Sequence, residues 1–93
     1  MKKSTVTVRR EKQLIVAITA RDIANGRRRS SDSCPLALSL KRRYPDAAID
    51  VTYDAVMVGD RELSLPGQAA LFMGAFDAGR PVKPTMLFFD APV

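Results

Sequence analysis

Hydrophobic and polar residues alternate in several short stretches of the chain, and this two-residue period predicts β-strands. Residues 5–9 alternate Thr with Val, and residues 13–19 form a more apolar run rich in β-branched side chains. The charged residues 10–12 lie between these stretches, so we expect an opening hairpin. Residues 49–53 alternate Ile, Val and Tyr with Asp and Thr, which predicts a strand with one face toward water.

A second hairpin and a last strand are predicted further along the chain. Residues 56–58 and 62–65 are strand-like and are joined by Gly59-Asp60, a pair typical of a tight turn. Residues 85–89 read Thr-Met-Leu-Phe-Phe and predict the last strand. Because its apolar residues occupy both faces, we expect this strand to be central in the sheet or covered by a helix.

Two short helices are predicted after the strand at residues 13–19. Thr19 and Asp22 have the spacing of a capping box, in which the hydroxyl accepts from the Asp amide and the carboxylate reaches back. Asn25-Gly26 is typical of a left-handed helix end. The second helix is expected to begin at Pro35, whose missing amide donor costs nothing in the first turn, and to end before Tyr44-Pro45.

The third helix has the clearest period and is expected to begin at Pro66 and to end at Gly79. Its apolar residues recur at i, i+3, i+4 and i+7 and form one stripe. That stripe consists of Ala69, Phe72, Met73 and Phe76.

These elements predict one α+β domain over residues 1–93, with a mainly antiparallel sheet of about five or six strands and three short helices. The third helix should cover one face of the sheet, and residues 1–4 are expected to be disordered. The expected core is the set of apolar side chains that these patterns turn inward: Leu14, Val16, Ile18, Ile23, Leu36, Leu40, Ile49, Val51, Val56, Leu63, Leu65, Phe72, Phe76, Leu87 and Phe89.

The length and composition are those of a single small domain. The chain has 93 residues, enough for one modest core. Its one cysteine excludes an internal disulfide, as suits a reducing compartment. No apolar run approaches the roughly 18 residues of a membrane span. We therefore expect a soluble, intracellular (cytoplasmic) protein without a membrane partner.

The charge is unevenly distributed and suggests a binding surface. The net charge is +5, but residues 1–43 carry a balance of +9 and residues 44–93 one of −4. Residues 27–33 hold no apolar side chain and should form an exposed, mobile loop. The candidate basic surface combines this loop with nearby cations: Arg27, Arg28, Arg29, Lys41, Arg42, Arg43, Arg9, Arg10 and Lys12. A phosphate-binding surface and a merely solvated one both remain open.

Catalytic chemistry has few candidates. The absence of histidine removes the commonest general base and metal ligand. Cys34 is the one candidate nucleophile, at a helix start near arginines, but the Cys-x5-Arg loop of cysteine phosphatases is absent because the sixth residue on is Leu40. A buried or helix-capping cysteine is favoured. Asp50 and Asp54 suggest a solvated strand face, and no metal or cofactor is expected.

Four ordered blocks of the sequence resemble a known group of proteins. They are residues 22–26 (Asp-Ile-Ala-Asn-Gly), 34–40 (Cys-Pro-Leu-Ala-Leu-Ser-Leu), 65–72 (Leu-Pro-Gly-Gln-Ala-Ala-Leu-Phe) and 76–84 (Phe-Asp-Ala-Gly-Arg-Pro-Val-Lys-Pro). The pattern, over about residues 15–89, resembles small proteins of unknown function from bacteriophages, prophages and actinobacteria. In that group a second cysteine often stands where this chain has Ser31, so the resemblance implies no metal or redox role for Cys34.

Three functional hypotheses follow. The favoured one is a non-enzymatic accessory protein of phage type that binds a host or phage protein, as a modulator or inhibitor, through the loop at 27–33. The second is a nucleic-acid-binding module that places the basic surface on a DNA or RNA backbone. The third is an enzyme or redox protein centred on Cys34. The +9/−4 division also permits a homodimer and leaves the oligomeric state open.

Overall fold

The computed structural model describes residues 12–91 and contains three helices and five strands in that range. The α+β class expected from the sequence is confirmed. Residues 5–9, the first strand of the expected opening hairpin, lie outside the described residues. The elements in chain order are β1 (Lys12–Ile18), α1 (Ala20–Asn25), α2 (Pro35–Arg43), β2 (Ile49–Val51), β3 (Ala55–Val58), β4 (Arg61–Ser64), α3 (Gly67–Asp77) and β5 (Thr85–Ala91).

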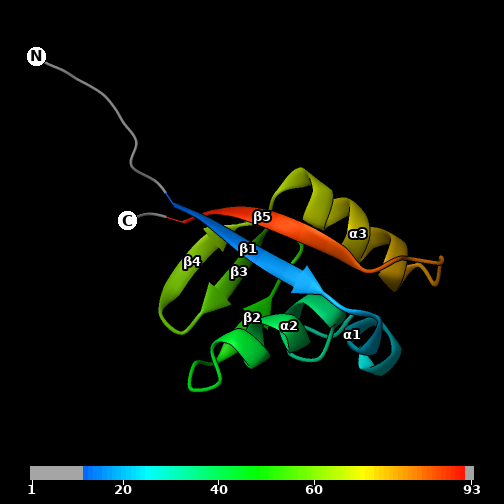
Figure 1. Cartoon of the computed structure of the whole chain (residues 1–93), viewed down its shortest axis with the longest axis horizontal. Coiled ribbons are helices and arrows are strands. Elements are labelled where there is room, and N and C mark those ends of the chain that lie inside the picture. Colours follow the sequence, from blue (N-terminus) through cyan, green and yellow to red (C-terminus); the bar gives the residue numbers. More distant parts are fainter. Residues whose placement is uncertain (1–11, 92–93) are drawn as a thin grey trace, which may run out of the picture.

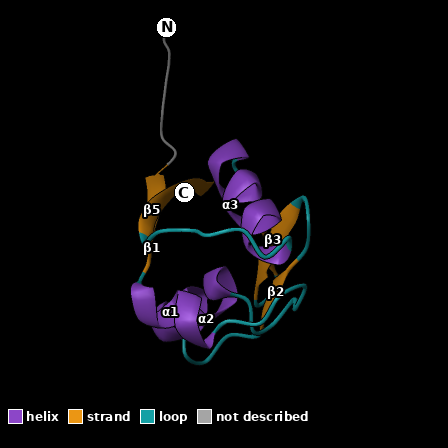
Figure 2. Cartoon of the chain, turned by 90° about the vertical axis from the view of Figure 1, so that its right-hand side faces the viewer, coloured by secondary structure: helices purple, strands orange, loops and turns teal. Residues whose placement is uncertain are grey.

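The five strands form two antiparallel sheets, where one sheet was expected. β1 pairs with β5, and β2, β3 and β4 form a meander. The two sheets lie on opposite sides of the core, with α3 across one open side and α1 and α2 across the other (Figures 1 and 2). Local turns explain the meander, whereas the pairing of β1 with β5 joins strands that are distant in sequence.

The core lies between the two sheets and the two helix layers, α3 on one side and α1 with α2 on the other. Of the expected core residues, only Ile23, Leu65 and Phe72 are partly buried, and the rest are buried. Four small or flexible side chains outside that set are also buried: Cys34, Ala37, Ala69 and Met73. Ala69 and Met73 belong to the predicted stripe of α3, and Cys34 is the N-cap of α2, so Ala37 in the first turn of α2 is the one that no pattern indicated.

β5 belongs to a two-stranded sheet and has one open face, so the expectation that it is central in the sheet is wrong. Leu87 and Phe89 are buried, whereas the side chains of Met86 and Phe88 are 53% and 45% exposed. Both helix layers and the other sheet lie on the inner side of the β1–β5 sheet (Figure 2). The outward side chains of Met86 and Phe88 are therefore partly open to solvent.

The end of α1 is also different from its prediction. The capping box of Thr19 and Asp22 is present. Gly26, however, has φ −73° and ψ 153°, an extended rather than a left-handed conformation. A glycine is needed there for space, since a Cβ atom would lie 2.7 Å from Pro35 Cδ. Gly79, just after α3, does adopt a left-handed conformation, with φ 81°, as does Gly59 in the turn between β3 and β4, with φ 65°.

β2 is shorter than predicted and ends at Val51. Thr52 and Asp54 lie in the turn that follows, where Thr52 Oγ1 donates to Asp54 Oδ1 at 3.1 Å and accepts from the Ala55 amide at 3.2 Å. These side-chain bonds favour a turn over an extended strand. The expected row of Asp50, Thr52 and Asp54 along one strand face is therefore wrong.

The two neighbouring phenylalanines of β5 provide a test of this packing. Phe89→Ala should lower the free energy of unfolding by about 3–5 kcal/mol because it empties a fully buried site. Phe88→Ala, on the open face, should lower it by less than about 1 kcal/mol. Urea denaturation of both variants measures the difference, and equal losses would contradict the assignment of inner and outer faces.

Candidate functional site

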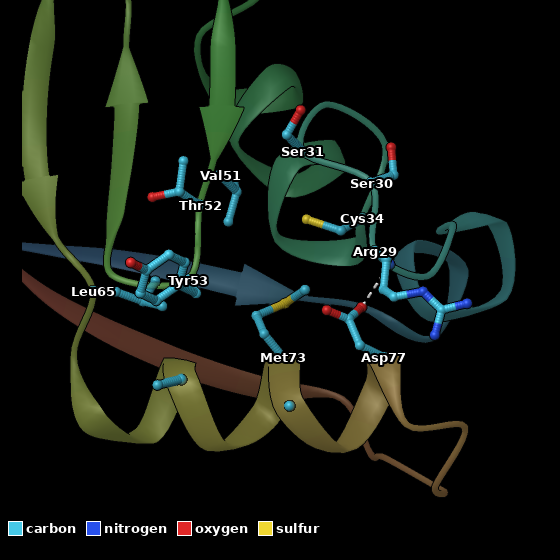
Figure 3. Close-up of a pocket in the computed structure, with 12 residues that line it drawn as sticks. Arg29, Ser30, Ser31, Cys34, Val51, Thr52, Tyr53, Leu65, Met73 and Asp77 are labelled. Atoms are coloured by element: carbon cyan, nitrogen blue, oxygen red, sulfur yellow. Dashed lines mark hydrogen bonds between the residues drawn. The ribbon is translucent and has the colours of Figure 1, made fainter.

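An open groove of about 500 Å³ lies between α3, the loop before α2 and the end of β2 (Figure 3). Its floor is mostly apolar and its rim carries hydroxyl and charged groups. The expected functional loop supplies part of the rim, but α3 and β2 supply the other walls. The lining residues are Arg29, Ser30, Ser31, Cys34, Val51, Thr52, Tyr53, Leu65, Ala70, Met73, Gly74 and Asp77.

The loop at 27–33 is exposed for most of its length, as expected, and its backbone is fastened to both walls of the groove. The Arg29 amide donates to Asp77 Oδ1 on α3 at 2.8 Å. The Val51 amide at the end of β2 donates to the Ser31 carbonyl at 2.7 Å. Arg29 has φ 55°, a left-handed conformation that is uncommon outside glycine. The groove therefore has a defined width that depends on these two bonds.

Hydrogen bonds inside the loop fix the rim further. Asp32 accepts from the hydroxyls of Ser30 and Ser33, at 3.1 and 3.2 Å, and Ser30 Oγ accepts from the Ser33 amide. The bonds from Ser30 and Ser33, with the positive charge of Lys41, lower the pKa of Asp32 below its usual value. The loop is thus an ordered turn with an ionised aspartate, not an unattached segment.

The α3 wall of the groove lacks large side chains at two positions that line the groove. Ala70 and Gly74 lie one turn apart, and both line the groove. A Cβ atom added at Gly74 would meet nothing within 4 Å. At the opposite edge, Tyr53 is 90% exposed in the turn after β2. An exposed aromatic ring beside an apolar floor is typical of a binding surface.

Cys34 lies at the bottom of the groove, and its interpretation as a buried helix-capping residue is confirmed. It is 1% exposed, and its Sγ accepts from the Ala37 amide at 3.4 Å at the start of α2. Burial raises the pKa of the Cys34 thiol, and the bonds from the Ala37 and Leu36 amides do not offset this. The thiolate that nucleophilic chemistry needs is therefore disfavoured at neutral pH.

The expected basic surface is divided between two places. Arg29 belongs to the groove, whereas Arg42 and Arg43 line a separate hollow beside β1. Arg9, Arg10 and the side chain of Lys12 lie outside the described residues. The members that the structure describes are all exposed: Arg27, Arg28, Arg29, Lys41, Arg42 and Arg43.

Some of these arginines hold the fold together. Arg42 donates to both carboxylate oxygens of the buried Asp22, at 2.6 and 3.0 Å, and to the Ala17 carbonyl at 3.3 Å. The guanidinium of Arg28 lies against Gly79, where an added Cβ atom would be 3.3 Å from Arg28 Cζ. Sequence reasoning grouped the cations by proximity along the chain and did not anticipate these structural roles.

The sequence also did not predict that α3 forms a wall of the groove, because the contact partners of a helix face depend on the fold. The apolar stripe of α3 predicts its buried face, whereas the candidate functional groups in the sequence were basic residues and Cys34. The spacing of Ala70, Gly74 and Asp77, four and then three residues apart, places them on one face of a helix. That spacing is readable in the sequence, but only the fold shows that this face borders the loop.

The chain matches no protein-family model, and comparisons with curated proteins and with solved structures find no significant match. In residues 12–91, no helix is both long enough and apolar enough to cross a membrane. The function is therefore inferred from the geometry of the groove and of the surrounding surface.

The ion pair of Arg42 with Asp22 should make stability depend on acid pH. Burial acts to raise the pKa of Asp22, but hydrogen bonds from Arg42 and Thr19 outweigh it and hold the pKa below its usual value. The stabilisation is therefore complete above the ordinary aspartate pKa of about 4 and is lost as the pH falls through the lowered value. Asp22→Asn should lose about 1–3 kcal/mol at pH 7.

Urea denaturation of both proteins between pH 7 and pH 2 measures this effect. The stability curves of the wild type and of Asp22→Asn should converge as the pH falls below about 4. A constant difference over the whole range would show that Asp22 stabilises the fold without its charge.

The burial of Cys34 predicts slow thiol chemistry. Iodoacetamide near neutral pH should alkylate the folded protein far more slowly than the protein in urea, because the thiol is buried and its pKa is raised. Mass spectrometry over time gives both rates. Similar rates in the two conditions would contradict the burial of the thiol and support the hypothesis that Cys34 is reactive.

Proposed function

We propose that this protein is a non-enzymatic accessory protein that binds a segment of a protein partner in the groove between α3 and the loop at 27–33. One observation carries the proposal: an apolar floor is open to solvent and bordered by a rim that the backbone holds at a fixed width. The groove volume, about 500 Å³, falls within the usual range of roughly 300–1,000 Å³ for binding sites.

The groove chemistry favours a partner segment with apolar anchor side chains. Val51, Leu65 and Met73 offer apolar surface, and the Tyr53 ring adds an aromatic edge. At the other end of the groove, the positive side chain of Arg29 and the carboxylate of Asp77 balance in charge. A segment whose apolar residues enter the floor and whose polar backbone meets the rim fits this pattern.

The two alternatives receive less support. An enzyme centred on Cys34 would need an accessible thiolate, and this thiol is buried with a raised pKa. A phosphate backbone would gain little in a groove where Asp77 balances Arg29. The resemblance to small phage and actinobacterial proteins agrees with an accessory role and does not identify the partner.

Photo-crosslinking in cells tests the proposal. Benzoylphenylalanine in place of Tyr53 preserves an aromatic group at the groove edge and should form a covalent adduct with one discrete protein. Gly74→Leu should abolish this adduct, because the leucine fills the groove from a helix position with free space around its Cβ atom. Gly67→Leu, also unobstructed but outside the groove lining, is the matched control and should leave the adduct unchanged.

The outcomes separate the proposal from its alternatives. Loss of the adduct in Gly74→Leu alone, with Gly74→Leu as stable in urea as Gly67→Leu, supports binding in the groove. An adduct that both variants retain would place the partner elsewhere. An adduct that nuclease removes would instead favour the nucleic-acid function.

A further inference from the structure

The β1–β5 sheet lies behind the groove in the view of Figure 3, and its outer face is turned away from both helix layers and from the other sheet (Figure 2). This outer face carries an apolar strip. Ile15, Met86 and Phe88 are 41%, 53% and 45% exposed. Ile15 is opposite Phe88 in the strand register, and Ala17 is opposite Met86. Residues opposite each other or two apart along a strand share a face, so these four side chains form one continuous patch.

Two arginines of α2 border this strip. A hollow of about 460 Å³ beside β1 is lined by Ile15 and Met86 from the sheet and by Ser39, Arg42 and Arg43 from α2. Two members of the strip, Ile15 and Met86, therefore line the same hollow as the two arginines. This hollow shares no lining residue with the groove.

The guanidinium of Arg42 is held in place before any partner binds. Arg42 is held by Asp22 and by the Ala17 carbonyl, and its side chain is still 52% exposed. Arg43 lies 5.8 Å over the ring of Tyr44, a group without charge, and so keeps its positive charge for a partner. Ordered side chains lose less conformational entropy on binding than free ones.

We propose that this second surface binds an acidic, amphipathic segment of a protein partner. Apolar residues of the segment would cover Ile15, Met86 and Phe88, and its carboxylates would meet Arg43, since the charge of Arg42 is already balanced by Asp22. The proposal does not depend on the groove function. If both hold, the protein is an adaptor that contacts two partners through separate surfaces.

Charge and hydrogen bonding disfavour other occupants of this face. In a symmetric contact between two copies, each copy would bring Arg43 to the same interface, and the like charges would oppose association. A strand added at the edge of β1 would compete with Ser39 Oγ, which donates to the Ala17 carbonyl at 2.6 Å. Aliphatic side chains such as Ile15 and Met86 offer nothing to a phosphate backbone.

An NMR titration of the full chain tests the proposal with two synthetic peptides. Both peptides alternate Leu or Phe with a charged residue, which is Glu in the first peptide and Lys in the second. The Glu peptide should give saturable shifts at Ile15, Met86 and Phe88 and bind at least about tenfold more tightly than the Lys peptide at low salt. Shifts that are absent, or equal for both peptides, would overturn the proposal.

Three variants assign the binding to this face. Phe88→Ser should weaken binding of the Glu peptide, and Arg43→Glu should shift the preference toward the Lys peptide. Tyr53→Ser alters the groove and should change neither result, which separates this proposal from the groove function. Shifts of the same residues that appear on concentrating the protein without peptide would assign the face to self-association and overturn the proposal.

Discussion

The pairing of β1 with β5 is the constraint on which the rest of the fold depends. These strands join the two ends of the described chain over seven residue pairs and form one complete wall of the core. Their inward side chains, among them Val16, Ile18 and Phe89, are buried against both helix layers. The three-stranded sheet can form from local turns, but without the opposite wall its inner face would be open to water. Folding must therefore close a loop of nearly the whole chain.

Features determined by neighbouring residues could be predicted from the sequence. The capping box at Thr19, the helix start at Pro35 and the turn at Gly59-Asp60 each depend on a few adjacent side chains, and all three are present. The apolar run at residues 85–89 identified a strand, but such a run cannot say what covers each face. Which face is covered depends on where the other sheet and the helices lie, and in this fold their placement leaves Met86 and Phe88 exposed.

The candidate site was harder to predict because distant segments meet there. Asp77 accepts from the Arg29 amide across 48 positions of sequence, and no local pattern marks that pair. The cluster of cations was evident in the sequence, but its division between two surfaces was not. Arg42 in particular owes its position to Asp22, a residue that the sequence assigned only to helix capping. Charge counts can indicate a binding surface, but they do not show which charged side chains form ion pairs that stabilise the fold.

The two bonds that fasten the loop have a consequence for how this protein can diversify. Both use main-chain atoms of the loop, the amide of residue 29 and the carbonyl of residue 31, with Asp77 and the Val51 amide as partners. A side chain such as that of Ser31 can therefore vary while the groove keeps its width, as long as Ser30, Asp32 and Ser33 keep their bonds and position 29 keeps its left-handed conformation. New specificities can arise on a constant framework, in the way that hypervariable loops of recognition proteins change their targets. The same property makes position 31 a suitable place to randomise in a designed library.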